Sequence, residues 1–278
     1  MLVKHAQRPA ARAPAPDGLL RLAGLGLGSG VVSLVEEYRR QLAWRDWELA
    51  LSLCPLLPGQ AVLDLGCGPG DVSGLLAARG ILVTGVDTSA ELLSAARERH
   101  AGCRFEQQDL RALQLPAGSF DGLWCSFTAA YFVDFEDTFA HWCELLKPQA
   151  WICLVEMDDL LGHEPLRAET HELIEAFYAQ ARAAGRYNFR AGATLPLAAQ
   201  NAGFAVQVRE LADQELSFEG PARAQVLDAW RARLARLVGL RRFLGAGFAQ
   251  FQDEFLRCLI APEHRSRCRV VCCVGTRG

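Results

Sequence analysis

The chain has 278 residues, of which 51% are hydrophobic, and this suits one large globular domain or a core with additions. Its 29 basic and 32 acidic residues give a net charge of −3, without a long run of one sign. This balance argues against nucleic acid or a membrane surface as a partner. No apolar stretch reaches the roughly 18 residues that span a bilayer, and residues 1–18 lack the apolar segment of a signal peptide. These features predict a cytoplasmic protein with a disordered N-terminal tail.

Ten cysteines raise the question of a metal site or disulfide bonds. No pair has the Cys-x-x-Cys spacing of zinc sites, and the closest two, Cys272 and Cys273, are adjacent within an apolar run. Cys54, Cys125 and Cys153 also lie among apolar residues, where a free thiol behaves as a small hydrophobic group. We therefore predict reduced, buried thiols and no bound metal.

Short apolar strands alternate with helices in the first half of the chain. The predicted strands are 61–65, 81–87, 103–109, 119–126 and 150–157. The predicted helices are 71–80, with Asp71 as its N-cap, 89–100, and 135–149, which ends at Pro148. This alternation is typical of a parallel sheet that helices cover on both faces.

The second half is less regular and is expected to add helices to the sheet. Its predicted helical segments are 165–185, 195–203 and 219–261, and its predicted strands are 204–211 and 268–276. No internal repeat is visible in the sequence.

The stretch GCGPG places three glycines on alternate positions between a strand and a helix, and such a loop allows a ligand to approach the backbone closely. A dinucleotide fingerprint, G-x-G-x-x-G, binds pyrophosphate at the start of the following helix. Here the third glycine comes one residue early, and Asp71 occupies the position of the fingerprint's last glycine. Because a carboxylate would repel pyrophosphate, the loop favours a ligand without phosphate over a nicotinamide dinucleotide.

The loop resembles the D-x-G-x-G-x-G motif of class I S-adenosylmethionine-dependent methyltransferases. The motif corresponds to Asp64, Gly66, Cys67, Gly68 and Gly70 in this chain. The resemblance continues in register: SFDGLWCS matches the family's fourth strand, LLKPQAWICLVE its fifth, and AGFAVQVREL the start of its sixth. It implies S-adenosyl-L-methionine as the cofactor.

The resemblance also implies roles for individual residues. Asp87, at the end of the second strand and beside Thr88, would accept hydrogen bonds from both ribose hydroxyls of the cofactor. Asp109 would accept a hydrogen bond from the adenine amine, and the backbone N–H of Leu110 would meet the ring. Ser126 would lie at the methionine end of the cofactor.

The resemblance implies an α/β fold: a Rossmann-like, seven-stranded, mostly parallel sheet with helices on both faces and helical lid insertions. The expected parts are a tail (1–18), an N-terminal helical cap (19–56), a cofactor-binding core (57–212 and 267–278, with a helical insert at about 158–193) and a lid (213–266). The two insertions would lie at the carboxyl edge of the sheet, where ligands bind in open α/β folds. An alternative for 213–266 is a dimer interface, so monomer and homodimer both stay open.

The methyl acceptor is expected to be a small molecule, lipophilic or similar to a natural product. After the fourth strand the chain reads Cys-Ser-Phe-Thr rather than the Asn/Asp-Pro-Pro-aromatic motif of enzymes that methylate nucleobases or glutamine. An oxygen acceptor needs a base, and the candidates are His163, Glu156 and Tyr131. Transfer to oxygen, nitrogen and carbon all stay open. An alternative function keeps the cofactor fold without methyl transfer, as in a cyclase, a decarboxylase or a cofactor-binding protein.

Overall fold

The computed structural model describes residues 34–277. The predicted tail and the first part of the predicted cap, 19–33, lie outside the described residues. The rest of the cap forms two helices, α1 (Leu34–Trp44) and α2 (Trp47–Leu53). Asp46 begins α2, because its side chain accepts a hydrogen bond of 3.0 Å from the backbone N–H of Leu49.

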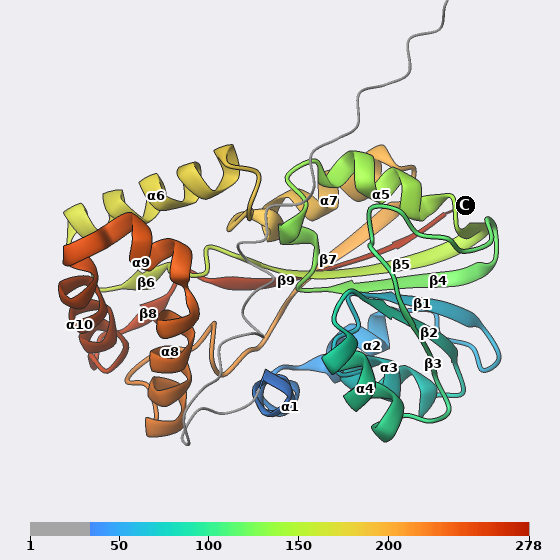
Figure 1. Cartoon of the computed structure of the whole chain (residues 1–278), viewed down its shortest axis with the longest axis horizontal. Helices are drawn as coiled ribbons and strands as arrows, with labels where there is room; N and C mark the ends of the chain where they lie inside the picture. Colours follow the sequence, from blue (N-terminus) through green and yellow to red (C-terminus); the bar gives the residue numbers. More distant parts are fainter. Residues whose placement is uncertain (1–33, 278) are drawn as a thin grey trace, which may run out of the picture.

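A seven-stranded sheet forms the centre of the molecule, in the order β3-β2-β1-β4-β5-β9-β7 (Figure 1). The strands are β1 (Ala61–Leu65), β2 (Leu82–Asp87), β3 (Arg104–Gln107), β4 (Phe120–Ser126), β5 (Leu146–Asp158), β7 (Ala205–Leu211) and β9 (Arg269–Thr276). Only β9 runs against the others, because it pairs antiparallel with both β5 and β7. The predicted mostly parallel, Rossmann-like sheet is therefore confirmed.

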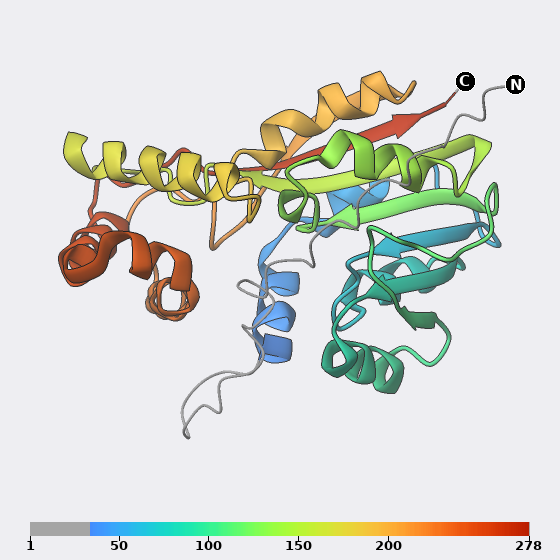
Figure 2. The same cartoon turned by 45° about the horizontal axis from the view of Figure 1, so that its top comes forward.

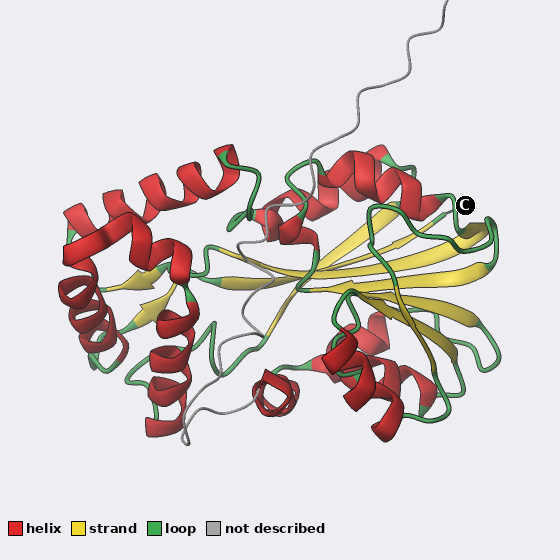
Figure 3. Ribbon diagram, in the orientation of Figure 1, coloured by secondary structure: helices red, strands yellow, loops and turns green. Residues whose placement is uncertain are grey.

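Helices cover both faces of this sheet (Figures 2 and 3). On one face lie α2, α3 (Asp71–Ala77) and α4 (Ala90–Arg99), and on the other lie α5 (Phe135–Cys143) and α7 (Ala191–Asn201). Trp124 and Trp151 are buried on the first side, and Phe139 and Trp142 on the second. The alternation of short apolar strands with helices thus gives a core on each side of the sheet.

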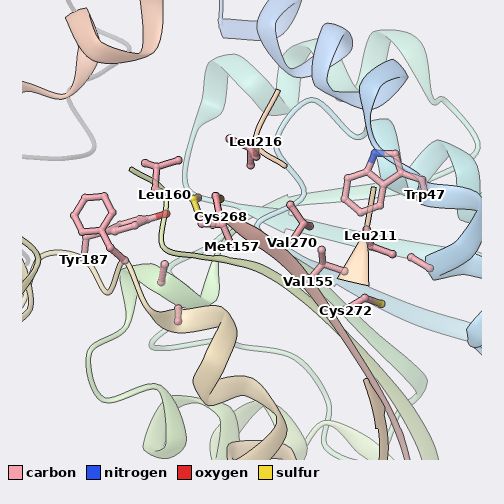
Figure 4. Close-up of a cluster of buried hydrophobic side chains, with 14 of the residues drawn as sticks. Trp47, Val155, Met157, Leu160, Tyr187, Leu211, Leu216, Cys268, Val270 and Cys272 are labelled. Atoms are coloured by element: carbon pink, nitrogen blue, oxygen red, sulfur yellow. The ribbon is translucent and has the colours of Figure 1, made fainter. Parts of the chain in front are cut away.

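The two insertions pack together at the carboxyl end of β5 (Figure 1). They comprise β6 (His163–Glu164), α6 (Ala168–Ala183), α8 (Ala224–Arg236), α9 (Val238–Leu244), the short 3-10 helix η3 (Gly245–Gly247), α10 (Phe248–Leu259) and β8 (Arg265–Ser266). Where one helical segment was predicted for 219–261, the chain forms three helices, because Leu237 leaves the helical region and Gly245 has a φ of +52°. Figure 4 shows buried side chains of the first insertion, Leu160 and Tyr187, which belong to the same hydrophobic core as Val155 and Val270 of the sheet.

Two local predictions were wrong. The N-cap of α3 is Gly70, in the left-handed region at a φ of +78°, and Asp71 is the first residue of the helix. Helix α5 ends at Cys143, and Pro148 lies inside β5. The register between β4 and β5 shifts between Phe120 and Gly122. Proline has no N–H to donate, and a strand tolerates it at such an irregularity.

Candidate functional site

A cavity of about 310 Å³ opens at the carboxyl ends of β1, β2 and β4. Strand β1 lies between β2 and β4, so the strand order runs outward in opposite directions on its two sides. Ligands bind in open α/β folds at such a point, beyond the carboxyl ends of the strands. The predicted residues that line the cavity are Gly66, Cys67, Gly68, Asp87, Thr88, Asp109, Leu110, Ser126 and Tyr131. The cavity therefore brings together segments from four parts of the sequence.

The three loop glycines all have positive φ, but their surroundings differ. A Cβ added to Gly66 would lie 2.0 Å from Oγ1 of Thr128, and one added to Gly70 would lie 2.9 Å from the ring of Phe105. A Cβ on Gly68 would meet nothing nearer than Cε2 of Tyr38, at 4.0 Å. Protein side chains thus fill the space that a Cβ on Gly66 or Gly70 would need. Of the three loop glycines, only Gly68 has open space on its Cβ side, and a ligand could occupy that space.

Asp64 lies beneath this loop and does not line the cavity. Its Oδ2 accepts a hydrogen bond of 2.6 Å from the hydroxyl of Ser73 in α3, and the side chain is buried. Burial raises the pKa of Asp64 to about 7, although the Ser73 hydrogen bond opposes the shift. The contact ties the end of β1 to α3, so Asp64 shapes the loop that lies between them.

Asp87 faces the cavity from the end of β2. Its Oδ2 accepts a hydrogen bond of 2.9 Å from the N–H of Gly68, and its Oδ1 accepts one of 2.8 Å from the N–H of Ser89. The side chain therefore holds the glycine loop against the start of α4. A carboxylate oxygen has more than one acceptor site, so these bonds leave capacity for a ligand hydroxyl.

The other predicted residues lie around the same space. Thr88 and Asp109 are exposed at its rim, and Ser126 is half-buried at the end of β4. Leu110 is buried, and its carbonyl accepts a hydrogen bond of 2.8 Å from the indole of Trp142. That bond fixes the segment after β3 against α5.

The sequence did not predict a second set of lining residues. These are Tyr38, Gln41, Leu42, Arg45, Trp47, Pro69, Asp71, Val72, Ser89, Leu92, Arg111, Phe127, Thr128, Phe132, Gly185 and Arg186. Four of them occur at helical spacing, at positions 38, 41, 42 and 45, so the amphipathic pattern at the start of the chain was a signal for a helix over the cavity. Phe127 has a φ of +52°, which is rare for a residue with a side chain and which no sequence pattern indicates.

Helix α1 is held over the cavity by ion pairs to the second insertion. Glu37 pairs with Arg236 of α8, and the buried guanidinium of Arg45 lies 2.7 Å from a carboxylate oxygen of Asp213. Arg45, the residue after α1, also lies 3.9 Å above the ring of Phe127, and this cation–π contact joins the end of α1 to the segment after β4. One wall of the cavity thus depends on the second insertion.

Of the three predicted bases, only Tyr131 lines the cavity. Its ring meets that of Tyr187 edge-on, with 4.9 Å between centroids. Glu156 is fully buried behind it, with Oε2 accepting a hydrogen bond from the N–H of Ala130 at 3.1 Å and Oε1 one from its neighbour Met157 at 3.0 Å. Burial raises the pKa of Glu156 to about 7. Burial and the carboxyl groups of Glu156 and Asp87 raise the pKa of Tyr131 to about 12, so the phenol is neutral at pH 7.

The third predicted base, His163, lies in the insertions and does not line the cavity. Its ring is fully buried, stacks on His264 and meets Trp230 and Phe255 edge-on. Its Nδ1 lies 3.0 Å from Nε2 of His264. This environment makes His163 a residue of the insertion core, and it has no place in the chemistry proposed below.

Acid is expected to destabilise the insertion core through this histidine. Burial and His264 lower the pKa of His163 to about 3, so the ring is neutral when folded and takes up a proton only on unfolding below pH 6.5. The free energy of unfolding is therefore expected to fall as the pH drops from about 6.5 towards 3. The slope should be smaller in His163→Leu, measured by urea unfolding at several pH values. His171→Leu, at a half-buried histidine of α6, is the control; equal slopes in all three proteins would contradict the prediction.

Within residues 34–277, no group of three or more histidine, cysteine or acidic side chains is arranged to hold a metal ion. The adjacent Asp158 and Asp159 each face arginines, with Arg269 2.7 Å from the first and Arg190 3.1 Å from the second. In the same range, no helix is long and apolar enough to cross a membrane.

Comparisons with known proteins agree with this geometry. Residues 62–149 match the family model described as a methyltransferase domain. The malonyl-[acyl-carrier protein] O-methyltransferase of Enterobacter lignolyticus is 29% identical over 112 residues, which is 40% of this chain and 45% of the relative. The trans-aconitate 2-methyltransferase of Escherichia coli is 33% identical over 111 residues, 39% of this chain and 43% of the relative. The chain thus spans less than half the length of these curated relatives.

A solved structure shares the fold over most of the chain. The geranyl diphosphate methyltransferase structure in complex with S-adenosylmethionine has a TM-score of 0.55 and 16% identity, covering 88% of each chain. The matched segment, 62–149, contains the glycine loop, Asp87, Asp109 and Ser126. Residues 62–149 thus match a methyltransferase domain, the two relatives are methyltransferases by name, and the chain shares its fold with a methyltransferase whose structure contains S-adenosylmethionine.

Proposed function

We propose that the chain transfers a methyl group from S-adenosylmethionine to a small-molecule acceptor. The observation that carries this proposal is the single cavity into which Gly68, Asp87 and Tyr131 all open. The cofactor end is formed by the loop and the ends of β2 and β3, and the acceptor end by α1, the segment after β4 and the loop at 185–186. By its name one relative methylates trans-aconitate, which supports a small acceptor, and the other methylates malonyl-[acyl-carrier protein].

The residues of the cofactor end fit S-adenosylmethionine. The open space above Gly68 is a cradle that any side chain would fill. Asp87 offers two carboxylate oxygens to neighbouring hydroxyls, and Asp109 offers an acceptor at the rim. Asp71 lies at the start of α3, where a dinucleotide would place phosphate, and its carboxylate is ion-paired with Arg99 at 2.6 Å. This carboxylate opposes a nicotinamide cofactor.

The chemistry then depends on positioning. When bound, S-adenosylmethionine would supply an activated methyl group for transfer to a lone pair of the acceptor. Tyr131, Phe127 and the α1 side chains hold the acceptor in line and exclude water. The neutral phenol of Tyr131 donates a hydrogen bond that orients the acceptor. Glu156, behind Ala130, supports the turn that carries Tyr131.

We expect Tyr131→Phe to lower kcat for methyl transfer about tenfold while the Kd of S-adenosylhomocysteine stays unchanged, since one orienting hydrogen bond of roughly 1–1.5 kcal/mol is lost. The assay incubates the chain with methyl-labelled S-adenosylmethionine and fractionated cell metabolites, and calorimetry gives the Kd. Tyr187→Phe, whose ring supports Tyr131 from behind, is the matched control. Cofactor binding without label transfer to any fraction would reject the proposal and favour a non-methylating member of the fold.

A further inference from the structure

The acceptor end of the cavity contains an arginine for which the described part of the chain provides no partner. Arg186 lines the cavity next to Gly185, and its side chain is exposed. Among residues 34–277, no carboxylate, carbonyl or aromatic ring contacts its guanidinium. The two other arginines of the cavity wall are both engaged: Arg45 with Asp213 at 2.7 Å, and Arg111 with Asp109 at 3.8 Å and with the ring of Phe132.

The backbone holds Arg186 in a defined position. Helix α6 ends in a Schellman motif, in which Gly185 has a φ of +67° and its N–H bonds to the carbonyl of Arg182 at 3.0 Å. The N–H of Arg186 bonds to the carbonyl of Ala181 at 3.0 Å. The next residue, Tyr187, is buried against Tyr131. The helix end thus fixes the Cα of Arg186 beside the wall that faces the acceptor.

The charges along the cavity are unequally distributed. The three carboxylates of the lining are Asp71, Asp87 and Asp109, which lie at the start of α3 and after β2 and β3. Asp71 and Asp109 are paired with arginines, and Asp87 accepts two backbone hydrogen bonds. The acceptor end thus has an unpaired positive charge and no carboxylate on its lining to balance it.

Resting on the proposed function, we propose that Arg186 binds a carboxylate of the methyl acceptor, so that the acceptor class is small organic acids. A guanidinium offers a planar pair of donors that matches the two carboxylate oxygens. A single guanidinium balances one negative charge, whereas a phosphate monoester carries nearly two at neutral pH. This favours a carboxylate over a phosphate. An acid also agrees with the neutral phenol of Tyr131, because an ionised carboxylate needs no base to become a nucleophile.

The test uses binding, so it does not depend on finding the natural acceptor. A panel of small mono- and dicarboxylic acids, each paired with its neutral amide, is titrated against the full chain saturated with S-adenosylhomocysteine, and the Kd is measured by calorimetry. We expect at least one acid to bind tenfold or more tightly than its amide. Arg186→Gln should reduce this ratio about tenfold, and Arg186→Lys should retain part of it, without a change in the Kd of S-adenosylhomocysteine.

Arg182→Gln is the matched control, since Arg182 is an exposed arginine of the same helix end that does not line the cavity. It should leave the acid-to-amide ratio unchanged. The proposal is overturned if no acid in the panel binds, or if the ratio is the same in the Arg186→Gln variant as in the wild type. Failure to bind S-adenosylhomocysteine at all would instead reject the proposed function, so the two failures are distinguishable.

Discussion

Asp87→Ala is expected to weaken the binding of S-adenosylhomocysteine by one to two orders of magnitude. The loss of one charge-assisted hydrogen bond to the cofactor, worth roughly 1.5–3 kcal/mol, already corresponds to about one to two orders of magnitude in the Kd. The Asp87 carboxylate also accepts hydrogen bonds from the N–H groups of Gly68, at 2.9 Å, and Ser89, at 2.8 Å, and so holds the glycine loop in place. Loss of the cofactor contact and loosening of the loop would both weaken binding. The measurement is the Kd by isothermal titration calorimetry, with far-ultraviolet circular dichroism to confirm that the fold is retained.

Glu91→Ala is the matched control for this variant. Glu91 lies in the first turn of α4, close to Asp87 in the sequence, but it is exposed and does not line the cavity. Its removal should leave the Kd unchanged. An unchanged Kd in Asp87→Ala as well would remove Asp87 from the cofactor site.

Gly66→Ala is expected to destabilise the protein and to abolish cofactor binding. The new Cβ would lie 2.0 Å from Oγ1 and 2.8 Å from Cγ2 of Thr128, and the backbone φ of +73° is itself unfavourable for alanine. The left-handed backbone costs about 1–2 kcal/mol and the overpacking about 1–3 kcal/mol, so we expect a loss of roughly 3 kcal/mol. Thermal unfolding should show a fall in Tm of about 6–12 °C.

Gly59→Ala separates the two contributions. Gly59 has a φ of +87°, but a Cβ there would meet no heavy atom within 4 Å. This variant should therefore lose only the backbone part, about 1–2 kcal/mol, and bind the cofactor normally. If Gly66→Ala is no less stable than Gly59→Ala, the close approach of Thr128 does not determine the choice of glycine.

The cofactor half of the fold could be predicted from the sequence because its signals are local. The residues from Asp64 to Gly70 give a strand, a tight loop and a helix within one short stretch, and the loop requires glycine for a reason that the structure makes explicit. Strand ends in a parallel sheet meet at one edge, so the strand pattern agreed with the positions of Asp87 and Ser126 that the family resemblance implied.

The acceptor half could not be predicted because its contacts are distant in sequence. Arg45 meets Asp213, and Tyr131 meets Tyr187, in pairs that only the tertiary fold brings together. His163 was predicted as a base because it follows a strand closely. In the structure it packs against Trp230 of α8 and Phe255 of α10 in the insertion core. The roles of the insertions as a lid or a dimer interface stay predictions.

The place of β9 in the sheet has a consequence for how the protein folds during synthesis. Strand β9 separates β7 from β5, so β7 has no partner in the sheet until the whole insertion at 212–268 and β9 have left the ribosome. Strands β1 to β5, by contrast, pair with neighbours that are already made. Closing such a long loop delays the non-local pairing. A nascent chain that stops before Arg269 would therefore expose one edge of β5, and an unpaired edge can pair with another chain.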